Sequence, residues 1–447
     1  MSASGRAAAG APATSVLLAA AGAGWEAEAL ERLSRGGPSV VVTKRCVDLT
    51  DLLGTAAAGT AAVAVVSPAL PGLDADSLAS LRRSGLGVVA VASAPEMLDG
   101  DAERMRRIGA DHVLSDGELA LLADTVRAAA AATATGPGGG SHHAAHARGG
   151  PDGSDGSGER GAPAPAGAAG RVLAVWGPAG APGRTTVAVG LAGELARAGR
   201  EVLLVDADAY GGSVAQHLGV LDEVSGLLAA ARAANAGQLD AARLAAVARS
   251  VGPGLRVLTG LPRPDRWQEV RQAAFEEVLS QATRLAAHVV LDLGFSLERE
   301  PGDPFGGGPQ RNLMTLAGLE RADEILVVGA ADPVGLARLA RGLVELGEVL
   351  RRPRPRVVVN RTRSSLGWSD QEIRGMVEGF GRPLAVHFLP EDRAAADRAL
   401  MAGHSLAECR DSALQTAVRE VADAVLGDTG GSRPARGLRR RRAGRAR

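Results

Sequence analysis

The sequence predicts an α/β protein with two domains, each built on a parallel or mostly parallel sheet. Apolar runs of strand length alternate with helical stretches over residues 13–131 and again over 171–426. That alternation is typical of a parallel sheet with helices on both faces. Residues 132–170 between them are rich in glycine, alanine, serine and proline, and include His142, His143 and His146. Such a segment buries too little apolar surface to fold, so we expect a disordered linker there.

Composition limits the class of protein. Lys+Arg and Asp+Glu both number 50, so any attraction to nucleic acid or membrane has to come from a local patch. Aromatic residues make up only 2% of the chain, which argues against a base-stacking surface. Cys46 and Cys409 form neither a metal pattern nor a disulfide framework. The apolar run at 15–24 is predicted as a buried first strand rather than a signal peptide. We therefore expect a cytoplasmic protein.

The N-terminal region predicts five short strands separated by helices. The expected helices include 25–34 and 76–84. Between the third strand and the helix at 76–84, Asp74 and Asp76 lie in a turn, where we expect solvated side chains. The strands are expected at 15–20, 38–43, 61–67, 87–92 and 111–115.

The middle of this region, residues 64–85, resembles the receiver domain of response regulators. In that family the third strand ends in a phosphoacceptor aspartate, whereas this chain has Ser67. The acidic pair expected after the first strand is replaced by Ala20 and Ala21, and the lysine expected after the fifth falls near Ser115. Receiver phosphorylation needs a carboxylate nucleophile and carboxylate-held Mg²⁺. The resemblance therefore implies a flavodoxin-like pseudoreceiver used for docking or dimerisation.

The second region opens with a strand at 171–176, a glycine-rich turn and a helix that ends at Gly199. Backbone N–H groups in such a turn, together with the helix N-terminus, form an anion site. The spacing GxGxxG of a dinucleotide-binding turn is missing, and Thr185-Thr186 suits Mg²⁺-phosphate better. The phosphate-binding residues are expected to be Gly180, Ala181, Pro182, Gly183, Arg184, Thr185 and Thr186.

This turn resembles the deviant Walker A loop of the MinD/ParA family of P-loop ATPases. In that alignment Arg184 takes the place of the phosphate-binding lysine, and Ala179 that of the signature lysine which reaches across a dimer. Pro178 and Ala181 replace two glycines, while Gly180 and Gly183 match. Arginine keeps the charge of lysine but not its geometry. The resemblance implies ATP and Mg²⁺ as ligands and leaves hydrolysis open, as at most a weak ATPase activity.

Polar residues at four later strand ends resemble the remaining motifs of the family. The resemblance implies that Asp208 positions the attacking water and that Asp206 supports the Mg²⁺ shell. Asp292 would be the Walker B carboxylate, which orients Mg²⁺ through water, with Thr185 supplying a hydroxyl ligand. The residues implied on the adenine side are Asn360, Pro390 and Asp392.

The order of domains resembles the CpaE/TadZ branch of this family, and a related actinobacterial branch is linked to septum-site determination. The resemblance implies a localisation factor that dimerises with ATP and positions Flp/Tad pilus or secretion machinery. Two other interpretations stay open. One is a nucleotide-independent scaffold with a vestigial loop, and the other is a ParA-like DNA-partition ATPase.

The last residues, 427–447, form an arginine-rich tail without acidic residues after Gly431. Three interpretations stay open: a solvated disordered end, an electrostatic tether to anionic lipid, and contact with DNA phosphates. A tether would place the protein at the inner face of the membrane. The preceding stretch, 406–427, is amphipathic, and we expect its apolar face to pack on the domain.

Overall fold

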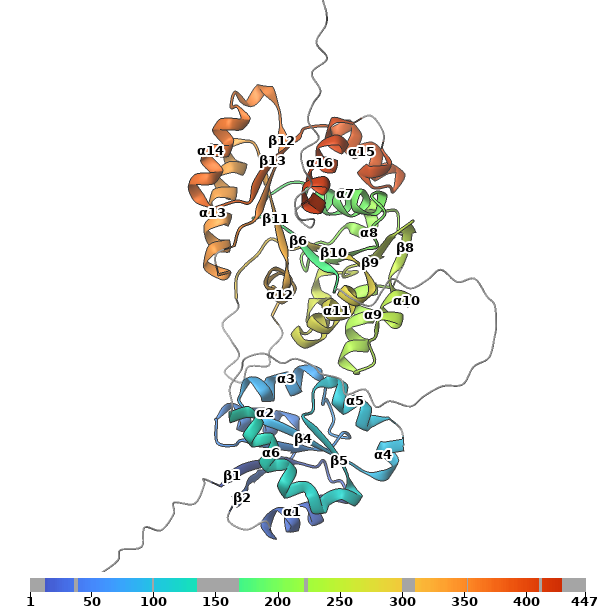
Figure 1. Ribbon diagram of the computed structural model, residues 1–447, viewed down its shortest axis with the longest axis vertical. Helices are drawn as coiled ribbons and strands as arrows, with labels where there is room; N and C mark the ends of the chain where they lie inside the picture. Colours follow the sequence, from blue (N-terminus) through green and yellow to red (C-terminus); the bar gives the residue numbers. More distant parts are fainter. Residues whose placement is uncertain are drawn as a thin grey trace, which may run out of the picture.

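The computed structural model describes residues 13–35, 39–98, 100–134, 169–220, 224–299, 310–351, 353–409 and 412–427. They form two α/β domains, the N-terminal one below the C-terminal one in Figure 1. The arginine-rich tail and nearly all of the expected linker, including its three histidines, lie outside the described residues.

The N-terminal domain has a five-stranded sheet in the order β2-β1-β3-β4-β5, with every pairing parallel. This is the strand order of flavodoxin-like folds, which confirms the predicted class. Its strands are β1 (Thr14–Ala19), β2 (Val40–Arg45), β3 (Val63–Val66), β4 (Gly87–Ala92) and β5 (His112–Ser115).

Helices cover both faces of this sheet because its central strands are buried on both sides. Helices α1 (Glu26–Arg35) and α6 (Leu122–Ala134) pack on one face. The other face carries α2 (Leu49–Ala57), α3 (Ala75–Arg83) and α5 (Asp101–Ile108), while α4 (Ala94–Leu98) precedes α5. Ser67, directly after β3, is fully buried, and its hydroxyl accepts a hydrogen bond from the N–H of Ala69 at 3.2 Å.

The C-terminal domain has an eight-stranded sheet in the order β13-β12-β11-β6-β10-β7-β9-β8. Every pairing is parallel except that of β8 with β9. The predicted mostly parallel sheet is therefore confirmed. The strands are β6 (Arg171–Trp176), β7 (Val202–Ala207), β8 (Arg249–Gly252), β9 (Leu255–Leu258), β10 (His288–Leu293), β11 (Glu324–Ala330), β12 (Arg356–Thr362) and β13 (Ala385–Pro390).

Two hydrophobic cores lie on opposite faces of the second sheet. One face is covered by α9 (Gly226–Asn235), α10 (Ala241–Val247), α11 (Gln272–Leu285), α12 (Leu313–Arg321), α13 (Pro333–Val349) and α14 (Asp370–Phe380). The other face is covered by α7 (Arg184–Arg197), α8 (Val214–His217), α15 (Arg393–Ala402) and α16 (Ala413–Gly427).

Helix α16 packs against α7, with its apolar side chains buried. Leu414, Val418 and Val425 join the core on that face of the sheet. The buried carboxylate of Glu194 on α7 accepts a hydrogen bond from the side-chain amide of Gln415. The amphipathic C-terminal stretch therefore packs on the domain, as its sequence pattern predicts.

The two domains contact each other through α3 and α11. Asp76 accepts a hydrogen bond of 3.2 Å from the N–H of Ala273, which lies in the first turn of α11. Arg271, the residue before this helix, provides no side-chain cap, so Asp76 takes that role from the other domain. Asp74 caps α3, and the guanidinium of Arg271 lies 3.8 Å from both carboxylates. The prediction that Asp74 and Asp76 are solvated turn residues is therefore wrong. Packing of the second domain covers their side chains, which are 20% and 12% exposed.

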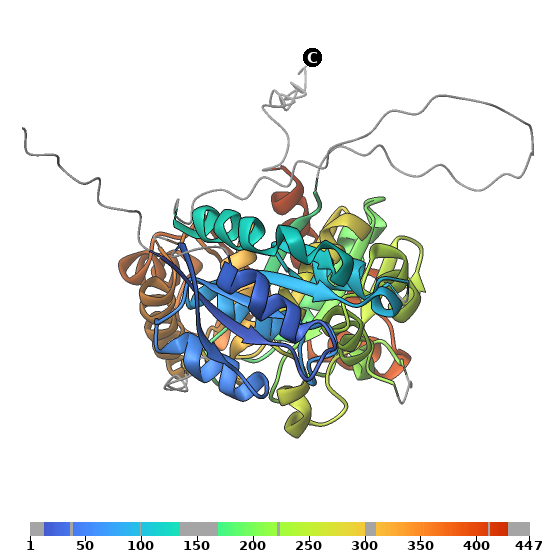
Figure 2. The same ribbon diagram turned by 90° about the horizontal axis from the view of Figure 1, so that it is seen from below.

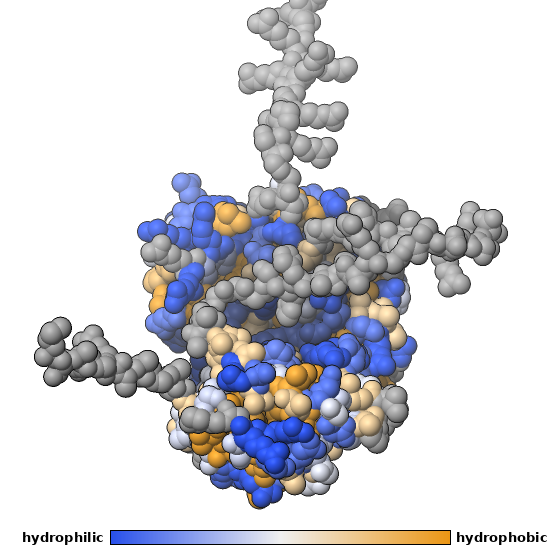
Figure 3. Space-filling view, turned by 60° about the horizontal axis from the view of Figure 1, so that its bottom comes forward, coloured by the Kyte–Doolittle hydropathy of each residue, from blue (hydrophilic) through white to orange (hydrophobic). Residues whose placement is uncertain are grey.

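The N-terminal domain lies in front when the molecule is seen from below (Figure 2). On the face shown in Figure 3, its hydrophilic and hydrophobic residues are interspersed. Among the described residues, no helix combines the length and apolar character needed to cross a membrane.

Candidate functional site

The glycine-rich turn between β6 and α7 is shaped by two glycines with left-handed backbone. Gly180 has φ +73° and Gly183 has φ +88°. A β-carbon at Gly180 would overlap the guanidinium of Arg338, and one at Gly183 would overlap the side-chain amide of Asn360. Gly183 precedes α7 and provides no side-chain cap. The first-turn N–H groups of α7 therefore keep their capacity for an anion.

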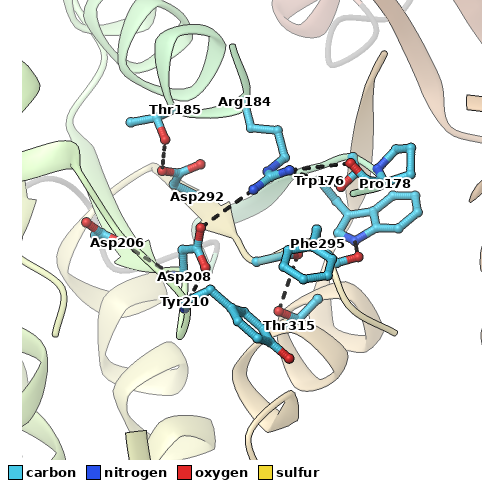
Figure 4. Close-up of polar contacts among 12 residues, drawn as sticks. Trp176, Pro178, Arg184, Thr185, Asp206, Asp208, Tyr210, Asp292, Phe295 and Thr315 are labelled. Carbon is cyan, nitrogen blue, oxygen red and sulfur yellow. Dashed lines mark hydrogen bonds and ion pairs between the residues drawn. The ribbon is translucent and has the colours of Figure 1, made fainter. Parts of the chain in front are cut away.

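The start of α7 is tied to the end of β10. The hydroxyl of Thr185 donates a hydrogen bond of 2.7 Å to Asp292, and these two side chains point toward each other in Figure 4. Asp292 is 1% exposed on a strand that is buried along its whole length. The structure thus brings together a hydroxyl and a carboxylate that lie 107 residues apart.

Arg184 folds back over the turn that it follows. Its guanidinium lies 3.6 Å from the carboxylate of Asp208, and the two side chains are 16% and 11% exposed. The same guanidinium donates to the carbonyl oxygens of Gly177 and Pro178 at 3.4 and 3.5 Å (Figure 4). Arg184 therefore brings a positive charge to the site, and Asp208 partly neutralises it.

Asp206 lies beside Asp292 in the sheet and faces the backbone of the segment after β7. Its carboxylate accepts from the N–H groups of Val214 at 3.1 Å and Asp208 at 3.4 Å. A β-carbon at Gly212 would overlap this carboxylate, and one at Gly260 would lie 2.6 Å from its carbon. Asp206 therefore orders the loop that carries Asp208.

Burial governs the protonation of the two innermost carboxyls. The pKa of Asp292 is raised to about 7, chiefly by burial and also by the charge of Asp208, against the lowering effects of the hydrogen bond from Thr185 and the charge of Arg184. Burial, and then the charge of Asp292, raise the pKa of Asp206 well above its ordinary range, against the N–H bonds that it accepts. The site therefore holds negative charge at a cost in free energy, which a bound cation would reduce.

Mg²⁺ fits this set of donors if phosphate and water oxygens complete its shell. The described residues contain no group of three His, Cys, Asp or Glu side chains that would hold a metal ion by themselves. Mg²⁺ in phosphate sites takes one or two protein oxygens beside those of the phosphates. Thr185 and Asp292 present such oxygens next to the N–H groups of α7.

The residues expected on the adenine side lie around a cavity of about 220 Å³, and Gly183 of the glycine-rich turn lines the same cavity. Asn360 donates to the carbonyl of Pro182 at 3.0 Å, so it holds the turn as well as lining the cavity. Pro390 lies at the end of β13, and Asp392 caps α15 and accepts from Ser412 at 3.0 Å. All three line the same cavity.

An aromatic contact between two loops of the site was not predicted from the sequence. The rings of Tyr210 and Phe295 lie 4.6 Å apart, and the guanidinium of Arg311 lies 4.0 Å from the Tyr210 ring. The Tyr210 hydroxyl donates to Asn312 at 2.8 Å. Tyr210 is the only tyrosine of the chain and stands two residues after Asp208, which was the one available signal. This contact connects the segment after β7 with the segments around β10 and α12.

No family model matches the chain, and no curated protein matches it either. Solved structures resemble it in part. A ParA family ATPase from Chlorobium tepidum has 21% identity and a TM-score of 0.48, covering 57% of this chain and 99% of its own. The cell division ATPase MinD of Pyrococcus furiosus has 19% identity and a TM-score of 0.47. The match covers 58% of this chain and 99% of that protein. The septum site-determining protein MinD of Pyrococcus horikoshii, complexed with Mg-ADP, has 17% identity and a TM-score of 0.46. The match covers 58% of this chain and 97% of that protein.

Proposed function

We propose that this chain is a MinD/ParA-like localisation factor that binds ATP with Mg²⁺ in its second domain. The observation that carries the proposal is the hydrogen bond between Thr185 and Asp292 at the uncapped start of α7. A hydroxyl, a strand-end carboxylate and a helix N-terminus at one point are the donors that a Mg²⁺-phosphate group requires.

Each part of the site has a role in this proposal. The turn 180–186 holds the phosphates through its N–H groups and through Arg184, whose fork suits phosphate oxygens. Thr185 and Asp292 hold Mg²⁺, which neutralises phosphate charge when bound. The adenine ring occupies the cavity lined by Asn360, Pro390 and Asp392.

Asp208 links phosphate binding to the chemistry. In the described structure it is paired with Arg184, so its carboxylate is occupied. A phosphate that draws the guanidinium toward itself releases this carboxylate, which then orients a water molecule. Asp206 supports this arrangement because it holds the Asp208 loop by its backbone. A catalytic carboxylate that must first leave an ion pair fits a weak ATPase.

The finer assignment is a CpaE/TadZ-type factor that dimerises with ATP and positions pilus or secretion machinery, or the septum site. We propose domains at 13–131 and 171–426, joined by a linker and followed by a basic tail that tethers the protein to the inner face of the membrane. The N-terminal domain serves as a pseudoreceiver. Directly after β3 it has the buried Ser67 instead of an accessible carboxylate. The hydroxyl of Ser67 accepts a hydrogen bond from the N–H of Ala69.

A titration with a fluorescent ATP analogue and Mg²⁺ tests the proposal. Wild-type protein should bind saturably, and Arg184→Ala should lose at least about tenfold in affinity, as expected for a charge-assisted hydrogen bond. Arg200→Ala is the matched control, because it removes an exposed arginine at the far end of α7 from the turn. Absence of saturable binding by the wild type would sink the proposal.

The scaffold interpretation has one specific observation in its favour. Arg184 is already paired with Asp208 and with two carbonyls of its own turn, so its guanidinium has partners without a phosphate. The same titration separates the two functions, because a scaffold shows no saturable binding. Deleting residues 427–447 tests the third interpretation: loss of DNA binding would support partition, and loss of envelope localisation would support assembly.

A further inference from the structure

Helix α13 lies directly along the glycine-rich turn. A β-carbon at Gly342 would come 3.0 Å from the ring of Pro178, and one at Gly180 would lie 3.0 Å from the guanidinium carbon of Arg338. Arg338 and Gly342 are four residues apart and so share one face of the helix. This face supplies one charged group to the turn, the guanidinium of Arg338.

Among the described residues, Arg338 has no acidic partner, in contrast to Arg184. Within the described part of the chain, its guanidinium makes no hydrogen bond and no ion pair with another side chain, and the residue is exposed. Arg184, by contrast, lies 3.6 Å from Asp208. Arg232 on α9, which is also exposed, has a carboxylate partner as well, because its guanidinium lies 2.7 Å from Glu269.

The charges around the turn explain why a second cation is needed. The guanidinium of Arg184 lies 3.6 Å from the carboxylate of Asp208, so its positive charge is already partly neutralised. A nucleotide adds several negative charges from its phosphates, and like charges held close together repel one another unless a cation lies between them. Residue 179, beside Gly180 in the turn, is an alanine and brings no charge.

We propose that Arg338 contacts the terminal phosphates of the bound nucleotide, so that α13 supplies the second cation of the phosphate site. This inference rests on the proposed nucleotide binding. The guanidinium reaches the turn over Gly180, where the missing side chain leaves the space that it occupies. Its five donors then form charge-assisted hydrogen bonds to phosphate oxygens instead of lying against backbone. Gly180 is thus required both for the left-handed backbone and for the approach of Arg338.

The test compares Arg338→Gln with Arg341→Gln in the full-length chain. Arg341 lies on the same helix, is also exposed, and stands three residues further on. Affinities for ATP, ADP and AMP are measured in Mg²⁺ by competition against a fluorescent ATP analogue, and thermal unfolding checks that both variants fold. Arg338→Gln should lose at least about tenfold in ATP affinity, the loss typical of one charge-assisted hydrogen bond. AMP affinity should change less than twofold, and Arg338→Lys should recover part of the loss.

Three results would overturn the inference. Equal ATP affinity of Arg338→Gln and wild type, with Arg184→Ala impaired, would remove Arg338 from the site and leave the proposed function standing. An equal loss for AMP and ATP would show that Arg338 does not act on the terminal phosphates. Failure of the wild type to bind any nucleotide would remove both the inference and the proposed function.

Discussion

Replacing Asp292 by asparagine should make the nucleotide-free protein more stable at neutral and alkaline pH. The carboxylate is buried at the end of β10 and accepts one hydrogen bond, from Thr185, which an asparagine oxygen also accepts. What the substitution removes is the cost of ionising this group inside the protein. Asp292→Asn therefore isolates the electrostatic part of the site from its packing.

The pKa of Asp292 gives the size and the direction of the effect. In the folded protein it is raised from 3.8 to about 7. Between these two values the folded state holds a proton that the unfolded state has lost, so the free energy of unfolding falls as the pH rises. At ~1.4 kcal/mol for each pKa unit, the wild type loses about 2 kcal/mol by pH 5 and about 4 kcal/mol above pH 7. Asp292→Asn escapes this loss.

Urea unfolding of the two proteins at pH 5 and pH 8 measures the effect. The variant should exceed the wild type by about 2 kcal/mol at pH 5 and by about 4 kcal/mol at pH 8. Asp265→Asn is the control, because its side chain is 68% exposed, and its effect should stay within about 0.5 kcal/mol at both pH values. A variant no more stable than wild type at pH 8, or one with the same advantage at both pH values, would refute the reasoning.

Two further predictions concern packing around the site and between the domains. Gly212→Ala should destabilise the protein by about 1–3 kcal/mol in urea unfolding, because its β-carbon would overlap the carboxylate of Asp206; Gly211→Ala has open space and should be neutral. Equal effects of the two alanines would contradict the enclosure of Asp206. Asp76→Ala should cost about 1 kcal/mol in thermal unfolding, since it removes the cap that Asp76 provides to the N–H of Ala273 in the other domain. A variant that melts at the wild-type temperature would show that this contact does not stabilise the domain interface.

The sequence predicted most of the sheet architecture and the residues that gather at the turn. Strand-length apolar runs located β6 without error, and the strand-end carboxylates of Asp206 and Asp292 lie side by side in the sheet. Such features are set by short-range patterns and by the parallel order of strands, which the chain order largely determines. The roles proposed for these residues stay predictions.

The contacts that the sequence did not predict are those made across elements. The position of Arg338 over Gly180 depends on the angle at which α13 crosses the turn, and no local pattern records that angle. Asp76 was expected in solvent because its neighbours form a turn, whereas the second domain covers it. The β8–β9 hairpin was also missed, since its strands are only four residues long and β8 ends in a glycine.

The arginine in the turn has a consequence for covalent control of the protein. Lys44 is the only lysine of the chain, and it lies in the N-terminal domain, 2.5 Å from Asp51. Lysine acetylation, which removes a positive charge, therefore has no target among the cations around Gly180. Reagents that acylate lysine have Lys44 as their one side-chain target in this sequence and leave the guanidinium groups intact. A dye or affinity handle placed on Lys44 consequently reports on the N-terminal domain while the phosphate turn keeps its native charge.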